Sequence, residues 1–179
     1  TMLHGTNNRH ILAGAGTITL EMVEQEPELD AMVIAIGGGS QAVGALTVLK
    51  SLRPEAKVYG VQASGAAAIY ESWKAGEPVT WPTADTFADG VATRSTYELT
   101  FPALLEGLAG FVTVDDSEIA EAVRILLRTT HNLVEGAGAC GLAGIMKLRD
   151  ELAGKKVGII LSGGNMDRET LRKVVCGEI

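Results

Sequence analysis

A short apolar run that ends in three consecutive glycines constrains this chain more than any other feature. The run spans Ala31–Ile36, and Gly37-Gly38-Gly39-Ser40 follows it before a helical pattern begins. Glycines let the backbone curl so that successive N–H groups point at one spot, and the next helix adds its unpaired N–H groups and the positive end of its dipole. The segment therefore predicts an anion-binding loop suited to a phosphate, with a tight turn lacking a ligand as the alternative.

Four short apolar runs alternate with helical patterns along the chain. Continuous apolar runs without polar alternation are typical of strands buried on both faces of a parallel sheet. The alternation predicts an α/β fold, a Rossmann-like open parallel sheet flanked by helices, in a single domain over residues 1–179. The expected strands are Ala31–Ile36, Lys57–Gln62, Phe111–Val114 and Lys156–Leu161, and the expected helices are Thr17–Gln25, Gln41–Leu52, Ala66–Ala75, Ser117–His131 and Leu142–Leu152.

The ends of these elements carry further signals. Gly76 follows one expected helix as a C-cap, and Ser117 opens another as a plain N-cap without a capping box. The stretch 76–96 has two prolines and no clear period, so it predicts a long loop, which in a compact domain usually serves a function.

Two more glycine-rich segments are placed where a ligand would bind. The last expected strand runs into Ser162-Gly163-Gly164-Asn165. Loops after parallel strands emerge at one carboxyl edge of the sheet, so Ser162 is expected to face the same crevice as the first glycine loop. Its hydroxyl can bond a neutral heteroaromatic nitrogen without forcing a charge on it. Glu135, before a third glycine cluster, is either a solvated cap or an acid that faces the ligand.

Composition and charge exclude several classes of function. The net charge is −7 with no visible cluster of basic residues, and 4% of the residues are aromatic, which argues against nucleic acid as a partner. No run of about 18 apolar residues exists to span a membrane. Cys140 and Cys176 offer neither a disulfide framework nor a paired metal spacing. We therefore expect a cytoplasmic protein that contacts neither nucleic acid nor a membrane.

A nucleotide is the weaker interpretation of the glycine loop. Gly37, Gly39 and Ala42 match the pattern G-x-G-x-x-A. A dinucleotide site also needs an acid at the end of the next strand, where this chain has Gln62 and Ala63. No Gly-Lys-Ser/Thr follows the glycines, so the P-loop pattern fails as well.

Five segments, in this order, resemble fold-type II pyridoxal-phosphate enzymes, closest to the threonine/serine dehydratases (ammonia-lyases) and serine racemases. Leu12–Thr17 is similar to the family's A-G-Q-G-T segment, Gly37–Ser40 to its tetraglycine phosphate loop, and Ala88–Val91 to its A-D-G-V segment beside the cofactor ring. Glu135–Gly138 is similar to the family's E-P-x-A-G segment, and Leu161–Asn165 to the strand end whose serine contacts the pyridine nitrogen.

The resemblance implies pyridoxal 5′-phosphate as the cofactor and much of the large domain of these enzymes as the fold. The implied activity is β-elimination of a hydroxy amino acid, such as L-threonine or L-serine, to a 2-oxo acid and ammonia, with amino-acid racemisation as an alternative. The resemblance implies that the phosphate is held by the backbone N–H groups of Gly37, Gly38, Gly39 and Ser40. It also implies that the Ser162 hydroxyl bonds the pyridine nitrogen and that Gly90 and Glu135 line the pocket.

The sequence departs from this family at the residue that carries the cofactor. The family's Schiff-base lysine lies in an N-terminal S-x-K-x-R-G segment that nothing in this chain matches, so no catalytic residue is assigned. We expect the C-terminal half of such an enzyme, with weak or no turnover alone; a half-enzyme that needs a complementary N-terminal chain is the alternative. The seven lysines, which look like solvated helix or turn positions, are Lys50, Lys57, Lys74, Lys147, Lys155, Lys156 and Lys173.

A second departure concerns metal ions. Many relatives carry a divalent cation on an acidic pair just after the second strand, and the aligned positions here are Gln62 and Ala68. An amide and a methyl group lack the anionic oxygens that Mg²⁺ or Ca²⁺ prefers. We expect no divalent cation there, and a tight, stoichiometric Mg²⁺ titration by calorimetry would contradict this expectation.

The partners follow from the same resemblance. A small amino acid is the expected substrate, and the sequence does not choose among threonine, serine, hydroxyaspartate and phenylserine. Thr93, Arg94 and Ser95 follow Gly90 and are either contributors to substrate choice or ordinary polar loop residues. Half of a domain exposes sheet edges and apolar faces, so we expect a homo-oligomer or a tightly bound second chain.

Overall fold

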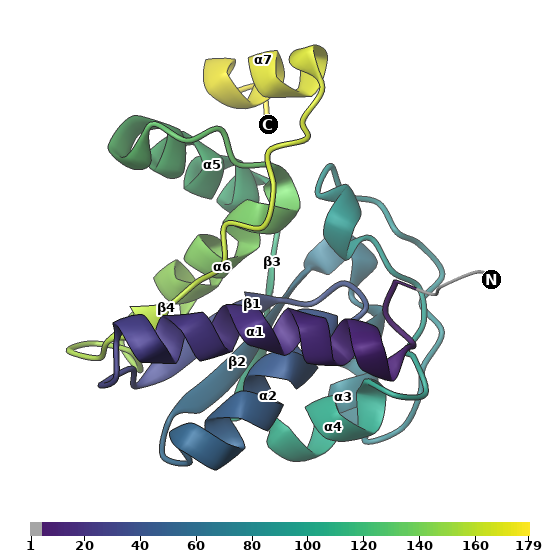
Figure 1. The fold of residues 1–179 in the computed structure, drawn as a ribbon. Helices are drawn as coiled ribbons and strands as arrows, with labels where there is room; N and C mark the ends of the chain where they lie inside the picture. Colours follow the sequence, from purple (N-terminus) through teal and green to yellow (C-terminus); the bar gives the residue numbers. More distant parts are fainter. Residues whose placement is uncertain (1–4) are drawn as a thin grey trace.

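Four parallel strands form the centre of the protein in the computed structural model, which describes residues 5–179 (Figure 1). Their order is β3-β2-β1-β4, with Ala31 of β1 paired to both Lys57 of β2 and Val157 of β4. The chain crosses from β3 back to the other side of β1 to form β4, so the strand order reverses between β1 and β4. Ligands bind at such a reversal in open α/β sheets. The predicted α/β fold with an open parallel sheet is confirmed.

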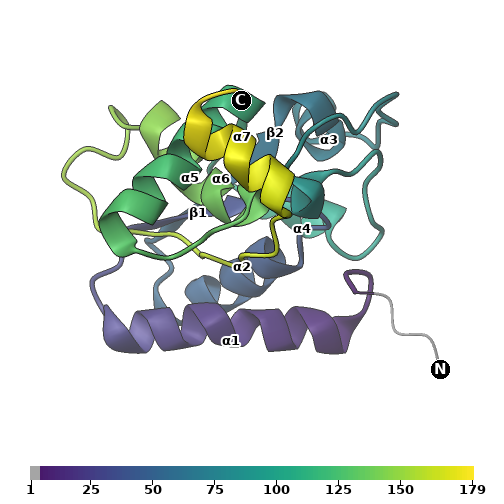
Figure 2. The same cartoon turned by 90° about the horizontal axis from the view of Figure 1, so that it is seen from above.

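Helices cover both faces of this sheet (Figure 2). The strands are β1 (Ala31–Ala35), β2 (Lys57–Ala63), β3 (Gly110–Val114) and β4 (Val157–Gly158). The α-helices are α1 (Arg9–Gln25), α2 (Ser40–Leu52), α3 (Ala68–Ala75), α4 (Phe101–Gly107), α5 (Asp116–Thr130), α6 (Gly136–Lys147) and α7 (Arg168–Cys176), and the 3-10 turns are η1 (Ser64–Ala66) and η2 (Asp89–Val91).

Two apolar cores lie on opposite faces of the sheet. Successive side chains of a strand point to opposite faces, and β1 feeds both cores accordingly. Met32 and Ile34 pack with α2 and with residues of α1, α3 and α4, whereas Val33 packs with α5 and α6. All three side chains are at most 1% exposed. Burial on both faces explains why the strand sequences show no polar alternation.

Helix α1 begins at Arg9, eight residues before the predicted start at Thr17. The Asn8 side chain caps it by accepting from the N–H of His10 at 2.9 Å. The segment before Thr17 is helical as well, and its backbone at the buried Gly16 packs directly on α2. A Cβ built on Gly44 of α2 would lie 2.6 Å from the Gly16 nitrogen, so the two helices touch backbone to backbone.

Two further helix starts differ from the prediction. Helix α6 begins at Gly136 instead of Leu142, because the glycines of its first turns fit against neighbouring segments: a Cβ on Gly136 would lie 3.0 Å from the Cα of Ala88, and one on Gly141 would lie 3.1 Å from the Val33 carbonyl oxygen. The N-cap of α5 is Asp115, with a full capping box through Glu118, so the prediction of a plain cap at residue 117 was wrong.

Helices α4 and α7 were not predicted, and β4 is shorter than expected. Helix α4 is only seven residues long and carries a proline in its first turn, so its sequence shows little period. Helix α7 is capped by the Asp167 side chain and buries only Val174. Strand β4 pairs with β1 over Val157 and Gly158 alone, after which the chain leaves the ladder. The C-cap at Gly76 is confirmed, with φ of 78°.

None of the helices within residues 5–179 combines the length and the apolar character needed to cross a lipid bilayer.

Tyr59 of β2 is expected to make the folded state sensitive to alkaline pH. Its side chain is buried, and its hydroxyl donates to Glu151 Oε1 at 2.7 Å. Burial, followed by the hydrogen bond to Glu151 and the charge of that residue, raises the pKa of Tyr59 from 10.0 to about 12. Because the folded pKa lies above the unfolded one, this stabilisation is complete below about pH 10 and is lost as the pH rises towards about 12.

Urea unfolding at several pH values tests this expectation with Tyr59→Phe as the control. Above about pH 10 the free energy of unfolding should fall more steeply in the unchanged chain than in Tyr59→Phe, which has no hydroxyl to ionise. Equal slopes in the two proteins would show that this hydroxyl does not couple to folding.

The two cysteines are expected to differ in reactivity. Burial, with a smaller contribution from the charge of Asp116, raises the pKa of the Cys140 thiol to about 12, whereas Cys176 is exposed. Since the thiolate is the reactive form, Ellman's reagent at mildly alkaline pH should titrate one thiol per folded chain and two after unfolding. Rapid reaction of both thiols in the folded chain would contradict this.

Candidate functional site

A cavity of about 210 Å³ lies at the carboxyl edge of the sheet, between the ends of β1 and β4. It is lined by segments that are far apart in the sequence and that the strand order brings together. All seven residues that the sequence singled out are among its lining: Gly37, Gly38, Gly39, Ser40, Gly90, Glu135 and Ser162. The structure thus places every predicted site residue at one cavity.

The glycine loop presents a row of N–H groups at this cavity. Gly39, which precedes α2, has φ of 88°, a backbone conformation that favours glycine. Within residues 5–179 the N–H groups of residues 37–42 donate to no acceptor, and the first to do so is that of Val43, to the Gly39 carbonyl at 2.9 Å. Unpaired N–H groups at the start of a helix attract an anion.

The loop has no room for side chains at two of its glycines. A Cβ on Gly38 would lie 2.2 Å from Thr6 Oγ1, and a Cβ on Gly37 would lie 2.2 Å from the Gly90 carbonyl oxygen. The glycines therefore serve close packing as well as backbone freedom. Thr6 also lines the cavity, and no sequence signal marked it because it precedes α1 in an irregular segment.

Glu135 joins α6 to the loop that carries Ser162. Its N–H donates to the Gly163 carbonyl at 3.0 Å, and its Oε2 accepts from the N–H of Asn165 at 3.1 Å. These bonds hold the Ser162 loop against the start of α6. Glu135 is the N-cap residue of that helix and the only charged side chain among the described residues that line the cavity. Glu135 is thus both the cap residue of α6 and part of the cavity lining, and its role toward a ligand stays a prediction.

The segment before Gly90 is held by Asp116, the first residue of α5. Its carboxylate accepts from Thr86 Oγ1 at 2.5 Å and from the N–H of Phe87 at 3.2 Å. Gly90 then packs so closely on α6 that a Cβ there would lie 2.7 Å from the Ala137 Cβ. Gly90, Glu135 and Ala137 also line a second cavity of about 140 Å³, which adjoins the first.

None of the chain's lysines reaches the cavity. All seven are exposed on helices, turns or strand ends, and none is among the described residues that line it. Because none of the described residues that line the cavity has a basic side chain, backbone N–H groups and helix dipoles are what the cavity offers an anion.

The Gln62 side chain, where relatives were expected to bind a cation, is fully buried and hydrogen-bonded. Its Oε1 accepts from the N–H groups of Ile69 and Tyr70, and its Nε2 donates to Thr93 Oγ1 at 3.1 Å. Residues 5–179 contain no group of three or more His, Cys, Asp or Glu side chains placed to hold a metal ion. The expectation that no divalent cation binds there stays a prediction.

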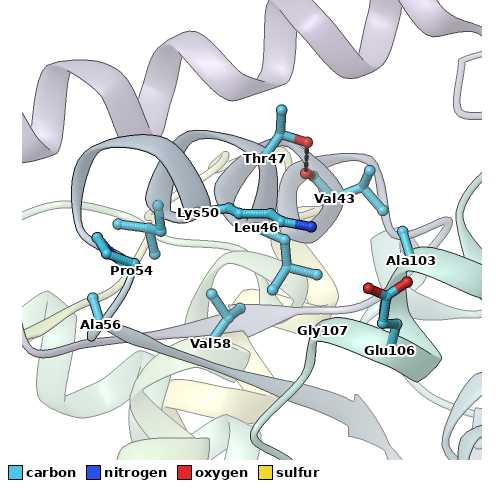
Figure 3. A pocket seen from close by; sticks show the side chains of 11 residues that line it. Val43, Leu46, Thr47, Lys50, Pro54, Ala56, Val58, Ala103, Glu106 and Gly107 are labelled. Carbon is cyan, nitrogen blue, oxygen red and sulfur yellow. Dashed lines mark hydrogen bonds between the residues drawn. The ribbon is translucent and has the colours of Figure 1, made fainter.

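A larger cavity of about 390 Å³ lies elsewhere, between the second half of α2, the start of β2 and α4 (Figure 3). Its wall is mainly apolar and includes Leu46 and Val58, with Lys50 and Glu106 as its two charged residues. It contains none of the seven candidate site residues and is not at the carboxyl edge of the sheet. We therefore place the candidate site at the smaller cavity.

Comparison with known proteins connects this geometry to a family. The family model described as "Pyridoxal-phosphate dependent enzyme" matches residues 1–163. The chain is 36% identical to the L-threonine ammonia-lyase of Thermotoga maritima over 173 residues, which are 97% of this chain and 43% of that protein. It is also 36% identical to the serine racemase of Dictyostelium discoideum, with 97% of this chain and 55% of that protein covered.

Solved structures agree with these sequence matches. The processed form of threonine deaminase isoform 2 from Solanum lycopersicum superposes with a TM-score of 0.91 at 32% identity, covering 96% of this chain and 51% of that one. The chain therefore spans about half the length of the relatives that it matches.

Proposed function

The chain belongs to the pyridoxal-phosphate dependent enzymes, and on this premise we propose that it binds pyridoxal 5′-phosphate in the cavity at the glycine loop. One observation carries the proposal: seven residues from four separate segments, each chosen from the sequence for that role, line this single cavity. The family supports the expected cofactor, and the individual residue roles are our assignment.

The residues present fit a phosphate. The cavity wall offers the unpaired N–H groups of Gly37, Gly38, Gly39 and Ser40, which also stand at the positive end of the α2 dipole. The loop has no space for a side chain at Gly37 or Gly38, so glycine is needed at both positions for these N–H groups to stay at the cavity. We assign the phosphate to these four N–H groups.

The aromatic ring of the cofactor would lie toward Ser162, Gly90 and Glu135 on the remaining wall. Ser162 can hydrogen-bond the pyridine nitrogen through its hydroxyl and leave that nitrogen neutral. Glu135 holds the Ser162 loop in place through its bonds to residues 163 and 165. When bound, the cofactor supplies the electron sink for reactions at the α-carbon of an amino acid. These residues bind and orient it.

The reaction that we propose for the whole protein is β-elimination of a hydroxy amino acid, such as L-threonine or L-serine, to a 2-oxo acid and ammonia. The similarity to an ammonia-lyase supports this reaction, and the similarity to a serine racemase supports racemisation as the second candidate. The lysine that carries the cofactor would come from a segment outside these 179 residues, in the same polypeptide or in a complementary chain. We expect a small amino acid as the substrate and, in keeping with the two unpaired cysteines, a cytoplasmic location.

Two measurements on the 179-residue chain test the proposal. Titration with pyridoxal phosphate, followed by absorbance, should show one saturable site, and Ser162→Ala should change the absorbance of the bound cofactor. An assay of 2-oxo acid release from L-threonine and L-serine should show weak or no turnover by the chain alone. Absence of saturable binding would overturn the cofactor site, and robust turnover would overturn the assignment of the lysine to another segment.

A further inference from the structure

Thr100, a fully buried threonine behind the glycine loop, makes an unusual hydrogen bond. Its side chain is 0% exposed, and its Oγ1 donates to the Gly38 carbonyl at 2.8 Å. Thr100 is the N-cap residue of α4, where a threonine hydroxyl ordinarily accepts from the N–H groups of the helix. Here it makes no such cap bond. The hydroxyl is directed away from its own helix and toward the loop.

The bond to one carbonyl fixes the direction of the next N–H group. The Gly38 carbonyl and the Gly39 N–H belong to the same peptide plane, and no peptide bond among residues 5–179 is cis. In a trans peptide the C=O and N–H bonds point in opposite directions. Since Thr100 holds the carbonyl from the α4 side, the N–H of Gly39 points away from α4.

A second, longer contact acts on the neighbouring peptide. Thr93 Oγ1 lies 3.5 Å from the Gly37 carbonyl oxygen, in the same plane as the N–H of Gly38. Gln62 Nε2 donates to this same hydroxyl at 3.1 Å, which leaves the hydroxyl proton for Gly37. The Gln62 amide is itself fixed, because its Oε1 accepts two N–H groups at the start of α3.

We propose that Thr100, assisted by Thr93, is a positioning residue that aims the N–H groups of Gly39 and Gly38 at the cofactor phosphate. The inference rests on the proposed cofactor site and adds to it the residues behind the loop. Without the hydroxyl at residue 100, the peptide between Gly38 and Gly39 can rotate, and an N–H that points elsewhere no longer binds the phosphate.

Affinity for two ligands separates this role from a merely structural one. Pyridoxal phosphate uses the loop, whereas pyridoxal has the same ring and no phosphate. Thr100→Val removes the hydroxyl at nearly constant volume and is expected to weaken pyridoxal phosphate binding about tenfold while pyridoxal binding stays the same. Thr100→Ser keeps the hydroxyl and should retain most of the affinity. Thr93→Val should act in the same direction by about threefold, because its contact is longer.

The matched control is Thr19→Val in α1. Thr19 is also 0% exposed, and its hydroxyl donates to the Met32 sulfur at 3.6 Å, away from the cavity. Thr19→Val should leave the affinities for pyridoxal phosphate and for pyridoxal unchanged. A loss of affinity in Thr100→Val that Thr19→Val does not show is therefore specific to the contact with the glycine loop. The titrations are made on the 179-residue chain at a temperature where thermal unfolding curves show every variant folded.

The outcomes separate failure of the inference about Thr100 from failure of the proposed cofactor site. A selective loss for pyridoxal phosphate in Thr100→Val, restored in Thr100→Ser, supports the inference. Equal losses for both ligands, or no loss, overturn the inference while the cofactor site stands. No binding by the unchanged chain overturns the proposed function and the inference with it. If Thr100→Val does not fold, Thr93→Val carries the same test, and unchanged selectivity there overturns the role of the contact behind the loop.

Discussion

Replacing Gly38 with aspartate is expected to weaken binding of pyridoxal phosphate by at least about a hundredfold, which corresponds to roughly 2.7 kcal/mol. Two physical effects add. A Cβ at residue 38 would lie 2.2 Å from Thr6 Oγ1, so the loop or the segment before α1 must move. The new carboxylate also places a negative charge where the phosphate would bind. Absorbance titration of Gly38→Asp beside the unchanged chain measures the effect.

Gly14→Asp is the control for this substitution. Gly14 lies on the exposed side of α1, and a Cβ there meets nothing within 4 Å. The same added charge at that position should leave the affinity almost unchanged. If Gly38→Asp bound the cofactor as tightly as Gly14→Asp, the phosphate would not lie on the glycine loop.

Gly44→Val is expected to lower the free energy of unfolding by about 3 kcal/mol, in the range of overpacking substitutions. A Cβ at Gly44 would lie 2.6 Å from the nitrogen and 2.8 Å from the Cα of Gly16. These are backbone atoms, so α1 must shift away from α2 as a unit. Urea unfolding of the two proteins measures the difference.

Gly14→Val provides the matched comparison, because it makes the same change on α1 at a site where the new side chain meets solvent. It should alter the free energy of unfolding by no more than about 0.5 kcal/mol. Equal effects of the two substitutions would show that the contact between Gly16 and Gly44 does not hold the helices together.

Strands β1 and β2 were predictable from the sequence because they are buried on both faces. Continuous Val and Ile runs located β1, β2 and β3 to within one residue at each end. The helices were less predictable where glycine occurs inside them. In α6 the early glycines weaken the helical pattern, yet Gly136 and Gly141 pack closely against partners that only the fold supplies, and in α1 the buried Gly16 meets the backbone of α2.

The residues that line the candidate site could be predicted from the sequence, but two threonines that contact the glycine loop could not. The glycine loop and Ser162 follow strands, and parallel strands bring their ends to one edge, so their meeting at one cavity could be expected. Thr100 and Thr6 could not be found in this way. Their roles depend on contacts with Gly38 across more than 30 residues of sequence, and nothing in their local pattern signals such contacts.

The most direct test of the account is intact-mass analysis after incubation with pyridoxal phosphate and reduction with borohydride, with any modified residue mapped. We predict no specific adduct on any of the seven exposed lysines, while absorbance titration of the same chain shows saturable cofactor binding that Gly38→Asp weakens by at least about a hundredfold. A single adduct on one lysine, unaffected by Gly38→Asp, would contradict it, because the cofactor would then be held away from the glycine loop by this chain's own amine.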